Sequence, residues 1–177
     1  MNKYQDIFLR YILIIFVALP NLYIFYLIFT PLTLYPIYFL FNLFIKTSLE
    51  NNTLFINGFA IEIIKACVAG SAYYLLFILN ISVPNIKLRK RAQMMIYSFA
   101  LFLFLNILRI IILSLVLFSG SSYFDITHKF FWYFVSTILV VLIWFAEVKI
   151  FKIKDIPIYS DLRFLFKKSL LKKQKKS

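Results

Sequence analysis

AIEIIKACVAGSAYYLLFILNI, the stretch from Ala60 to Ile81, decides how the chain is organised. It is long and apolar enough to cross the hydrocarbon core of a bilayer, about 30 Å thick, as one helix. It also holds Cys67, the single cysteine of the chain. Two more polar residues stand alone in later apolar segments: Arg109 in FLNILRIIILSL and His128 in DITHKFFWYF. The sequence predicts that these three side chains meet near one face of a membrane.

The composition indicates an integral membrane protein. Its 177 residues are 63% hydrophobic and 20% aromatic, with a mean hydropathy of +0.87, whereas soluble domains are about half apolar. Glycine is scarce and no repeat is visible, so we expect one membrane domain over residues 1–148 and a basic tail over 149–177. No small-residue cleavage site follows the first apolar run, which favours a retained helix over a signal peptide.

The net charge of +13 does not indicate nucleic-acid binding, because of where the cations lie. Ten of the 20 Lys and Arg fall between Lys149 and Lys176, and four between Lys87 and Arg91. Both groups flank apolar spans, as the positive-inside rule requires of cytoplasmic segments, and anionic lipid headgroups account for the tail. We therefore expect a multi-pass protein of the cell membrane with a cytoplasmic C-terminal tail and no nucleic-acid partner.

The apolar segments predict an all-α bundle of about four or five transmembrane helices. The expected full-length helices are Ile7–Phe29, Ala60–Ile81, Ala92–Phe118 and His128–Val148, the first kinked at Pro20.

Two details of this plan stay open. The segment Leu32–Ile45 falls below the roughly 17 residues of a full span, so it is re-entrant, interfacial or a short helix lengthened by its flanks. If it does not cross, the N-terminus is cytoplasmic, which Lys3 and Arg10 against Asp6 weakly favour; if it does, the N-terminus is outside. The piece Thr53–Gly58 predicts a small extended turn, because Asn-Gly is a turn signal.

The predicted depths of the three lone polar residues agree. Cys67 lies roughly 12 Å below the outer end of a helix that starts near Phe59, and Arg109 roughly 14 Å below Phe118. His128 opens its helix at the same face. A lone Cys is often a small buried hydrophobe, and a lone His is often interfacial. An Arg within a span is expensive and usually has a task, and Asn106 lies one turn before it, where it can orient the guanidinium.

Together these residues form a coherent thiol chemistry. A thiolate of Cys67 attacks a carbonyl, the His128 imidazole accepts and returns a proton, and Arg109 stabilises the oxyanion. Ser71, Asp125 and Glu62 are weaker candidates for the surroundings of the site. One Cys and one His are too few ligands for a metal, so we expect neither a metal nor a cofactor.

The order of these motifs resembles the exosortase/archaeosortase family of membrane cysteine enzymes, in a compact form. The run Ala66-Cys67-Val68-Ala69-Gly70-Ser71 is followed by Asn106-Ile107-Leu108-Arg109 one helix later and then by His128. The resemblance covers roughly residues 57–144, and the chain is shorter than the larger members, with fewer N-terminal helices.

The resemblance implies a protease/transpeptidase with Cys67 as nucleophile, Arg109 as second catalytic residue and His128 as third. Its substrates would be secreted proteins that end in a short motif, a membrane helix and a basic cluster. The acceptor of the cleaved product would be water or a cell-surface molecule, which includes membrane lipid.

Two other classes of function remain. A non-catalytic assembly or lipid-binding subunit would pair Arg109 with Glu62 or Asp125. A transporter would use Arg109 as an anion site, but the few spans and the lack of repeat halves disfavour this reading.

Overall fold

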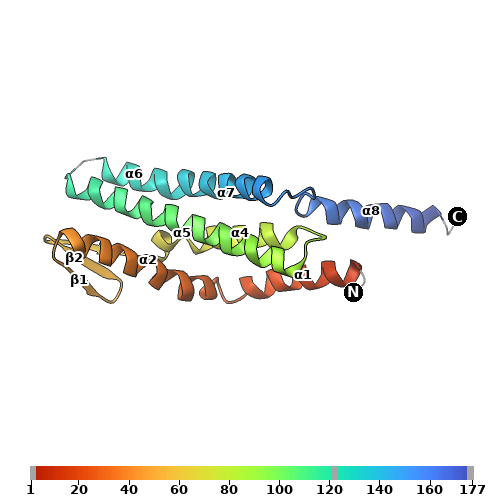
Figure 1. Ribbon diagram of the computed structural model, residues 1–177, viewed down its shortest axis with the longest axis horizontal. Coiled ribbons are helices and arrows are strands. Elements are labelled where there is room, and N and C mark those ends of the chain that lie inside the picture. Colours follow the sequence, from red (N-terminus) through yellow and green to blue (C-terminus); the bar gives the residue numbers. More distant parts are fainter. Residues whose placement is uncertain (1–2, 121–122, 175–177) are drawn as a thin grey trace.

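The computed structural model describes residues 3–120 and 123–174, without the side chains of residues 125, 132 and 169–174. It is an elongated bundle of helices with one small sheet at the end opposite the termini (Figure 1). In chain order the elements are α1 (Lys3–Ala18), α2 (Tyr23–Phe44), β1 (Thr47–Glu50), β2 (Thr53–Ile56), β3 (Phe59–Glu62), α3 (Lys65–Val68), α4 (Gly70–Ser82), α5 (Leu88–Phe118), α6 (Phe124–Phe130), the π-helical turn η1 (Phe131–Val135), α7 (Ser136–Ile150) and α8 (Tyr159–Gln174).

The expected helical membrane fold is confirmed. Among the described residues, four helical segments are long and apolar enough to span a bilayer: Tyr23–Phe44, Lys65–Ser82, Leu88–Phe118 and Ile126–Ile150. The last of these joins α6, η1 and α7 into one rod. The small sheet is the only departure from an all-helical fold within the described ranges.

The expected first helix, Ile7–Phe29, is wrong. The chain makes tight turns from Leu19 to Leu22, and both Asn21 (φ 49°) and Leu22 (φ 59°) adopt the left-handed conformation. Pro20 thus stands at a complete break between α1 and α2 and not at a kink.

Of the three readings left open for Leu32–Ile45, the structure has the helix lengthened by its flank: residues 32–44 form the second part of α2, and Ile45 follows its end. Pro31 and Pro36, which read as punctuation in the sequence, lie inside this helix. Membrane helices tolerate proline where neighbouring helices satisfy the freed carbonyl groups. In Figure 1, α1 and α2 follow one another along the long axis, so the N-terminus lies at the same end of the bundle as the C-terminus.

The expected helix Ala60–Ile81 divides into three elements. Phe59–Glu62 is strand β3, Lys65–Val68 is the single turn α3, and Gly70–Ser82 is α4. Between α3 and α4 the backbone of Ala69 is left-handed (φ 57°). A short apolar run such as AIEII suits a buried strand as well as a helix, and here pairing with β2 decides for the strand.

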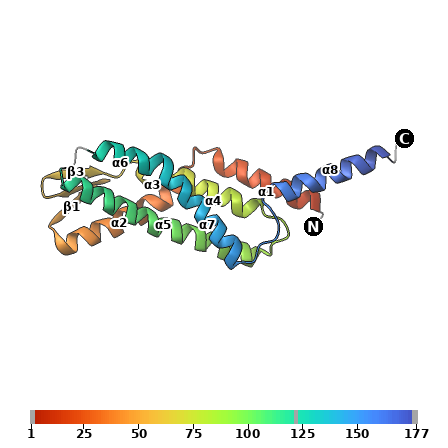
Figure 2. The same cartoon turned by 90° about the horizontal axis from the view of Figure 1, so that it is seen from above.

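The sheet is a meander in the order β1-β2-β3, antiparallel throughout. A two-residue turn of Asn57 (φ 47°) and Gly58 (φ 84°) joins β2 to β3, the geometry that Asn-Gly favours in hairpins. One face packs toward the helices through the buried Leu54 and Ile56, and Phe59 contacts Phe118 of α5 at 5.4 Å between ring centroids. Figure 2 shows β3 on the side of the sheet near α6.

The core is aromatic and lies between α2, α4 and α5. Phe29 stacks on Tyr73 at 3.5 Å, and Tyr73 meets Phe102 edge-on at 4.9 Å. Gly70, at the start of α4, is buried, and a Cβ there would lie 2.7 Å from the Tyr26 ring. The glycine therefore lets α4 approach α2 directly beside the element that carries Cys67.

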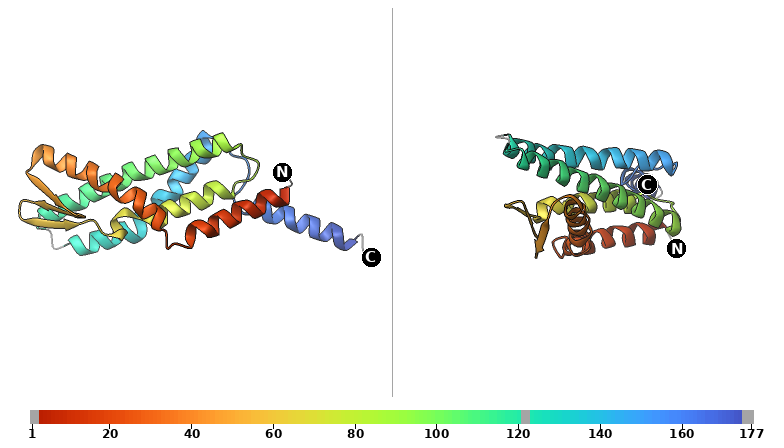
Figure 3. Two further views of the ribbon diagram at one scale, coloured as in Figure 1. Left: turned by 90° about the horizontal axis from the view of Figure 1, so that it is seen from below. Right: turned by 60° about the vertical axis from the view of Figure 1, so that its left-hand side comes forward.

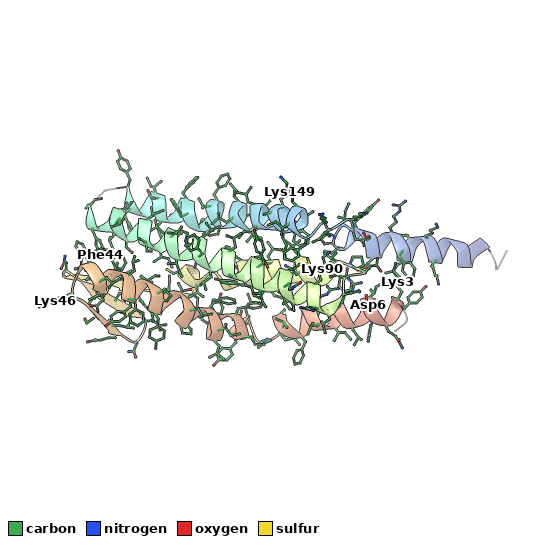
Figure 4. The ribbon with its side chains drawn as sticks, in the orientation of Figure 1. Lys3, Asp6, Phe44, Lys46, Lys90 and Lys149 are labelled. Carbon is green, nitrogen blue, oxygen red and sulfur yellow. The ribbon has the colours of Figure 1, made fainter. Side chains whose placement is uncertain are left out.

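Two buried arginines hold the opposite end of α4. Arg91 donates from Nη1 to the carbonyl of Asn80 at 2.7 Å and from Nη2 to that of Val83 at 2.9 Å. Arg10 donates to the carbonyl of Ser82 at 3.1 Å and binds the Asp161 carboxylate of α8 at 3.0 Å. Side chains labelled at this end in Figure 4 are Lys3, Asp6 and Lys90, whereas Phe44 and Lys46 lie at the sheet end.

The ion pairs of Arg10 outweigh its burial. Burial alone would lower the pKa of the Arg10 guanidinium, but the hydrogen bonds and charges of Asp161 and Asp6 raise it. The guanidinium therefore stays charged, and it links α1, α4 and α8.

Candidate active site

Cys67, Arg109 and His128 line one cavity of about 330 Å³. They come from α3, α5 and α6, which are far apart in the sequence. Apart from these three side chains and the polar Glu62 and Ser114, the lining is apolar: Ala60, Ile61, Ile63, Ile64, Ile110, Leu113, Leu117 and Phe124. The cavity lies toward the sheet end of the bundle, between β3, α5 and α6, whose positions can be followed in Figures 2 and 3.

Cys67 is held in a short helical turn and not inside a long helix. It is half-buried and its thiol is free. The turn is anchored by the backbone bond from Cys67 N–H to Ile64 O at 2.9 Å and ends at the left-handed Ala69. The depth of Cys67 expected from the sequence assumed one continuous helix from Phe59, and the structure has no such helix. Strand β3 and the turn α3 position the thiol instead.

Arg109 fastens this turn to two other helices. It is only 4% exposed, and its Nη1 donates to Ser136 Oγ at 2.6 Å, while its Nη2 donates to the carbonyl of Ala66 at 3.4 Å. Its Nε–H has no partner among the described residues. A guanidinium has five N–H groups, so these two bonds leave further donors. Because Arg109 lines the cavity, its guanidinium can bind an anionic oxygen there.

Asn106 lies one turn before Arg109 and also acts on α3. Its Nδ2 donates to the Cys67 carbonyl at 2.9 Å. We expected Asn106 to orient the guanidinium; the structure instead has it hold the backbone of the cysteine itself. Asn106 and Arg109 thus donate hydrogen bonds to the carbonyls of two consecutive residues, Cys67 and Ala66.

His128 lies one turn inside α6, which begins at Phe124, so the expectation that it opens its helix is wrong. Its ring stacks on that of Phe124 at 5.8 Å between centroids. In the parts of the chain that the structure describes, the imidazole makes no hydrogen bond, so no protein group there competes for its nitrogens. Both rings line the same cavity wall.

The remaining sequence candidates lie apart from this arrangement or outside it. Ser71 is exposed and lines a separate cavity with Tyr26 and Lys65, and it is not among the residues that line the cavity of Cys67. Glu62 lines the cavity but forms no ion pair with Arg109 in the described residues. The side chain of Asp125 lies outside the described ones.

Two residues that matter to the arrangement were not expected from the sequence. Ser136 receives the Arg109 hydrogen bond and donates to the carbonyl of Phe131 at 3.2 Å, across the turn η1. It lies eight residues after His128, a spacing that keeps both on one stripe of a helix, and that spacing was the available signal.

Glu147 is the second missed residue. It is fully buried and accepts a hydrogen bond from Asn80 Nδ2 at 3.2 Å, far along α7 from the cavity. An acidic residue within an apolar run such as WFAEVKI is a signal for a buried polar contact, and this was the signal that could have found it.

Comparison of the chain with protein-family models, curated protein sequences and solved structures gives no match.

Proposed function

We propose that this protein is a membrane-embedded cysteine protease/transpeptidase that acts on a peptide bond of a membrane-anchored substrate. The observation that carries the proposal is that Cys67, Arg109 and His128 line one apolar cavity. The resemblance of the motif order to exosortases and archaeosortases supports the same reaction class. The substrates would be secreted proteins whose C-terminus carries a short motif, an apolar helix and a basic cluster.

The cation distribution supports a cavity toward the outer face of the membrane. Lys87–Arg91 and α8 lie at the end of the bundle with both termini (Figure 1), and such clusters favour the cytoplasm. The sheet end, near which the cavity lies, is then extracytoplasmic. A substrate that has been exported through the membrane would present its scissile bond on that side.

The first half of the reaction forms a thioester. His128 takes the proton from the Cys67 thiol, and the thiolate attacks the carbonyl carbon of the scissile bond. The carbonyl oxygen becomes an oxyanion, which the guanidinium of Arg109 in the cavity wall is suited to stabilise. As the carbon–nitrogen bond breaks, His128 gives its proton to the leaving amine.

The second half regenerates the thiol. Water, an amine or an alcohol of a surface acceptor attacks the thioester carbon, and His128 accepts the proton of that nucleophile. Collapse of the second tetrahedral intermediate breaks the carbon–sulfur bond and returns the proton to Cys67. Membrane lipid is one class of acceptor that the apolar surroundings favour.

The test is the replacement Cys67→Ala at the chromosomal copy in the source organism. We expect the secreted proteins with an apolar C-terminal helix and basic cluster to remain uncut, measured by mass spectrometry of their C-terminal peptides. Thr137→Val, an exposed change on α7, is the matched control and should process normally. Membrane abundance of each variant is measured by immunoblot.

Unchanged processing by the inserted Cys67→Ala protein would overturn the nucleophile assignment. It would instead favour a non-catalytic assembly or lipid-binding subunit, in which Arg109 serves only to fasten α3 to α5 and α7 through Ala66 and Ser136. That function is our second candidate because both observed hydrogen bonds of Arg109 go to the protein itself.

A further inference from the structure

Strand β3 presents its edge to the cavity. Three consecutive residues of the strand, Ala60, Ile61 and Glu62, line the cavity that contains Cys67, together with Ile63 and Ile64 that follow it. Side chains along a strand alternate between its two faces, so a cavity against one face would meet every second residue. A cavity that meets each residue in turn runs along the strand edge.

The ladder shows which backbone groups point to that edge. The N–H of Ile63 donates to the carbonyl of Asn52 at 2.8 Å, so this pair is hydrogen-bonded. Antiparallel pairs alternate between bonded and non-bonded; the next pair, Thr53 and Glu62, is therefore non-bonded.

The alternation continues to the turn. Leu54 and Ile61 form a bonded pair, and Phe55 and Ala60 form a non-bonded one. The N–H and C=O of Ala60 and the N–H of Glu62 therefore point away from β2.

Because the sheet order is β1-β2-β3, no strand of the described chain pairs with the other side of β3. Of the outward groups, the carbonyl of Glu62 accepts from the Ile64 N–H at 3.2 Å. The three others make no bond elsewhere in the described residues. An open edge of this kind is a template for another strand.

We propose that the substrate binds as an extended segment that pairs with β3 as a fourth strand and so brings its scissile carbonyl to Cys67. This rests on the proposed function for the identity of the reacting bond. Cys67 lies five residues after Glu62, where β3 ends, and lines the same cavity, so a strand laid along Ala60–Glu62 extends toward the thiol. Backbone pairing supplies affinity, and the apolar cavity selects alternate side chains.

The unpaired backbone groups favour a peptide over a lipid as the occupant. A lipid chain would bury the N–H of Ala60 and Glu62 without a partner, which is unfavourable. A helical segment has its backbone groups bonded internally and cannot satisfy them either. An extended peptide satisfies both at once, so the cleavable segment of the substrate must leave its helix before it enters the cavity.

The test uses a tethered probe in place of a natural substrate. The peptide acetyl-Val-Thr-Val-Thr-Val, with a 2-pyridyl disulfide linked to its C-terminus, is coupled to Cys67 of the full-length protein in lipid nanodiscs. Hydrogen–deuterium exchange with residue-level fragmentation then compares tethered and free protein. We expect the amides of Ala60 and Glu62 to exchange about tenfold more slowly after tethering, from one new hydrogen bond each.

Two controls isolate the backbone pairing. A matched peptide whose amide nitrogens are methylated at every second residue, in the two possible registers, should give protection in one register only. In the protein, Ala60→Pro removes the outward N–H without touching the β2–β3 bonds, whereas Ala60→Ser retains it. Tethered Ala60→Pro should lose the protection at Glu62, and Ala60→Ser should keep it.

The exchange experiment tests the pairing of a peptide with β3 independently of catalysis. Slowed exchange supports the fourth strand whether or not Cys67→Ala abolishes processing. Tethering without slowed exchange, or failure of the peptide to reach Cys67, overturns it and leaves the processing assay to judge the enzyme. The amide of Ala60 could already be protected from exchange in the free protein and lose that protection on dilution. This result would mean that a second copy of the protein occupies the edge of β3, and it would also overturn the proposed pairing with the substrate.

Discussion

The side chain of Arg109 joins three parts of the bundle. It stands on α5, donates to Ser136 at the start of α7, and donates to the carbonyl of Ala66 in α3. These two bonds fix the plane of the guanidinium, and they leave three of its five N–H groups, Nε–H among them, without a partner in the described residues. Arg109 therefore both holds α3 and α7 in place and offers a positively charged group to a ligand in the cavity.

Arg109→Lys should separate these roles. A lysine ammonium has no rigid fork and cannot hold Ser136, Ala66 and a substrate oxygen together. We expect processing to fall about 10²–10³-fold, as when one oxyanion donor is removed, measured by the C-terminal peptide assay. Ser136→Ala, which removes only an anchor of the guanidinium, should have the smaller effect. Normal processing by Arg109→Lys would exclude a role in oxyanion binding.

Gly70 is constrained by a single neighbour. An added Cβ would lie 2.7 and 2.8 Å from two ring carbons of Tyr26, closer than van der Waals contact. Gly70→Ala should lower the free energy of unfolding by about 1–3 kcal/mol, as overpacking does, measured by thermal unfolding in nanodiscs. Tyr26→Leu combined with Gly70→Ala should recover most of that loss, because the clash is with the ring. Additive losses in the double variant would contradict this explanation.

At the scale of elements, the sequence predicted the later helices better than the earlier ones. The spans that became α5 and the α6–α7 rod were recognisable because they are long, apolar and bounded by charges or polar loops. The break before α2 and the continuity of α2 were not, because proline marks both in the sequence and the packing of α2 on its neighbours decides between them.

The cysteine segment shows the same limit at the site itself. The residue types of Cys67, Arg109 and His128 were recognisable, and the structure brings them to one cavity. The structure around these residues was not recognisable from the sequence. The run AIEII forms part of strand β3 because it pairs with β2, and this pairing is a tertiary contact. The open strand edge, on which substrate binding is proposed to depend, was therefore invisible to helical periodicity.

The hairpin depends on Gly58. Its φ of +84° lies in the region that branched side chains avoid. Gly58→Val should destabilise the β2–β3 hairpin by about 1–3 kcal/mol and increase amide exchange at Leu54 and Ile61. Gly120→Val is the matched control, since Gly120 also has a positive φ (+67°) but lies after α5. Equal exchange in the hairpin of the two variants would show that the turn does not govern its stability.

At the scale of the whole molecule, two polar systems hold the bundle at opposite ends. Arg109 and Asn106 organise the cavity near the sheet, while Arg10 and Arg91 bind the last carbonyls of α4 at the end with the termini. The buried pair of Asn80 and Glu147 adjoins the second system, because Arg91 binds the carbonyl of Asn80. We infer that these contacts set the register of the helices, because side-chain packing between apolar surfaces alone specifies it weakly.

The ion pair of Arg10 and Asp161 extends this organisation to the basic tail, which the sequence suggested was a separate segment. Asp161 is 1% exposed and its carboxylate lies 3.0 Å from Arg10 Nη2. Asp161→Ala would leave the guanidinium of Arg10 with one carboxylate fewer in a buried position. Breaking a buried pair of this kind lowers stability by about 3–5 kcal/mol, so we expect a lower unfolding temperature in nanodiscs.

The same variant should also release α8. Lys152 and Lys154 lie in the connection before it, so limited trypsin digestion should cut Asp161→Ala there faster than the native protein. Asp6→Ala is the matched control: it also removes a carboxylate 3.0 Å from Arg10, but that side chain is 36% exposed and lies on α1 itself. It should change stability by less than about 1 kcal/mol and leave the cleavage rate unchanged. Equal cleavage of the two variants would mean that the ion pair does not dock α8, and that other contacts, such as Lys3 on the Phe164 ring at 4.1 Å, hold it in place.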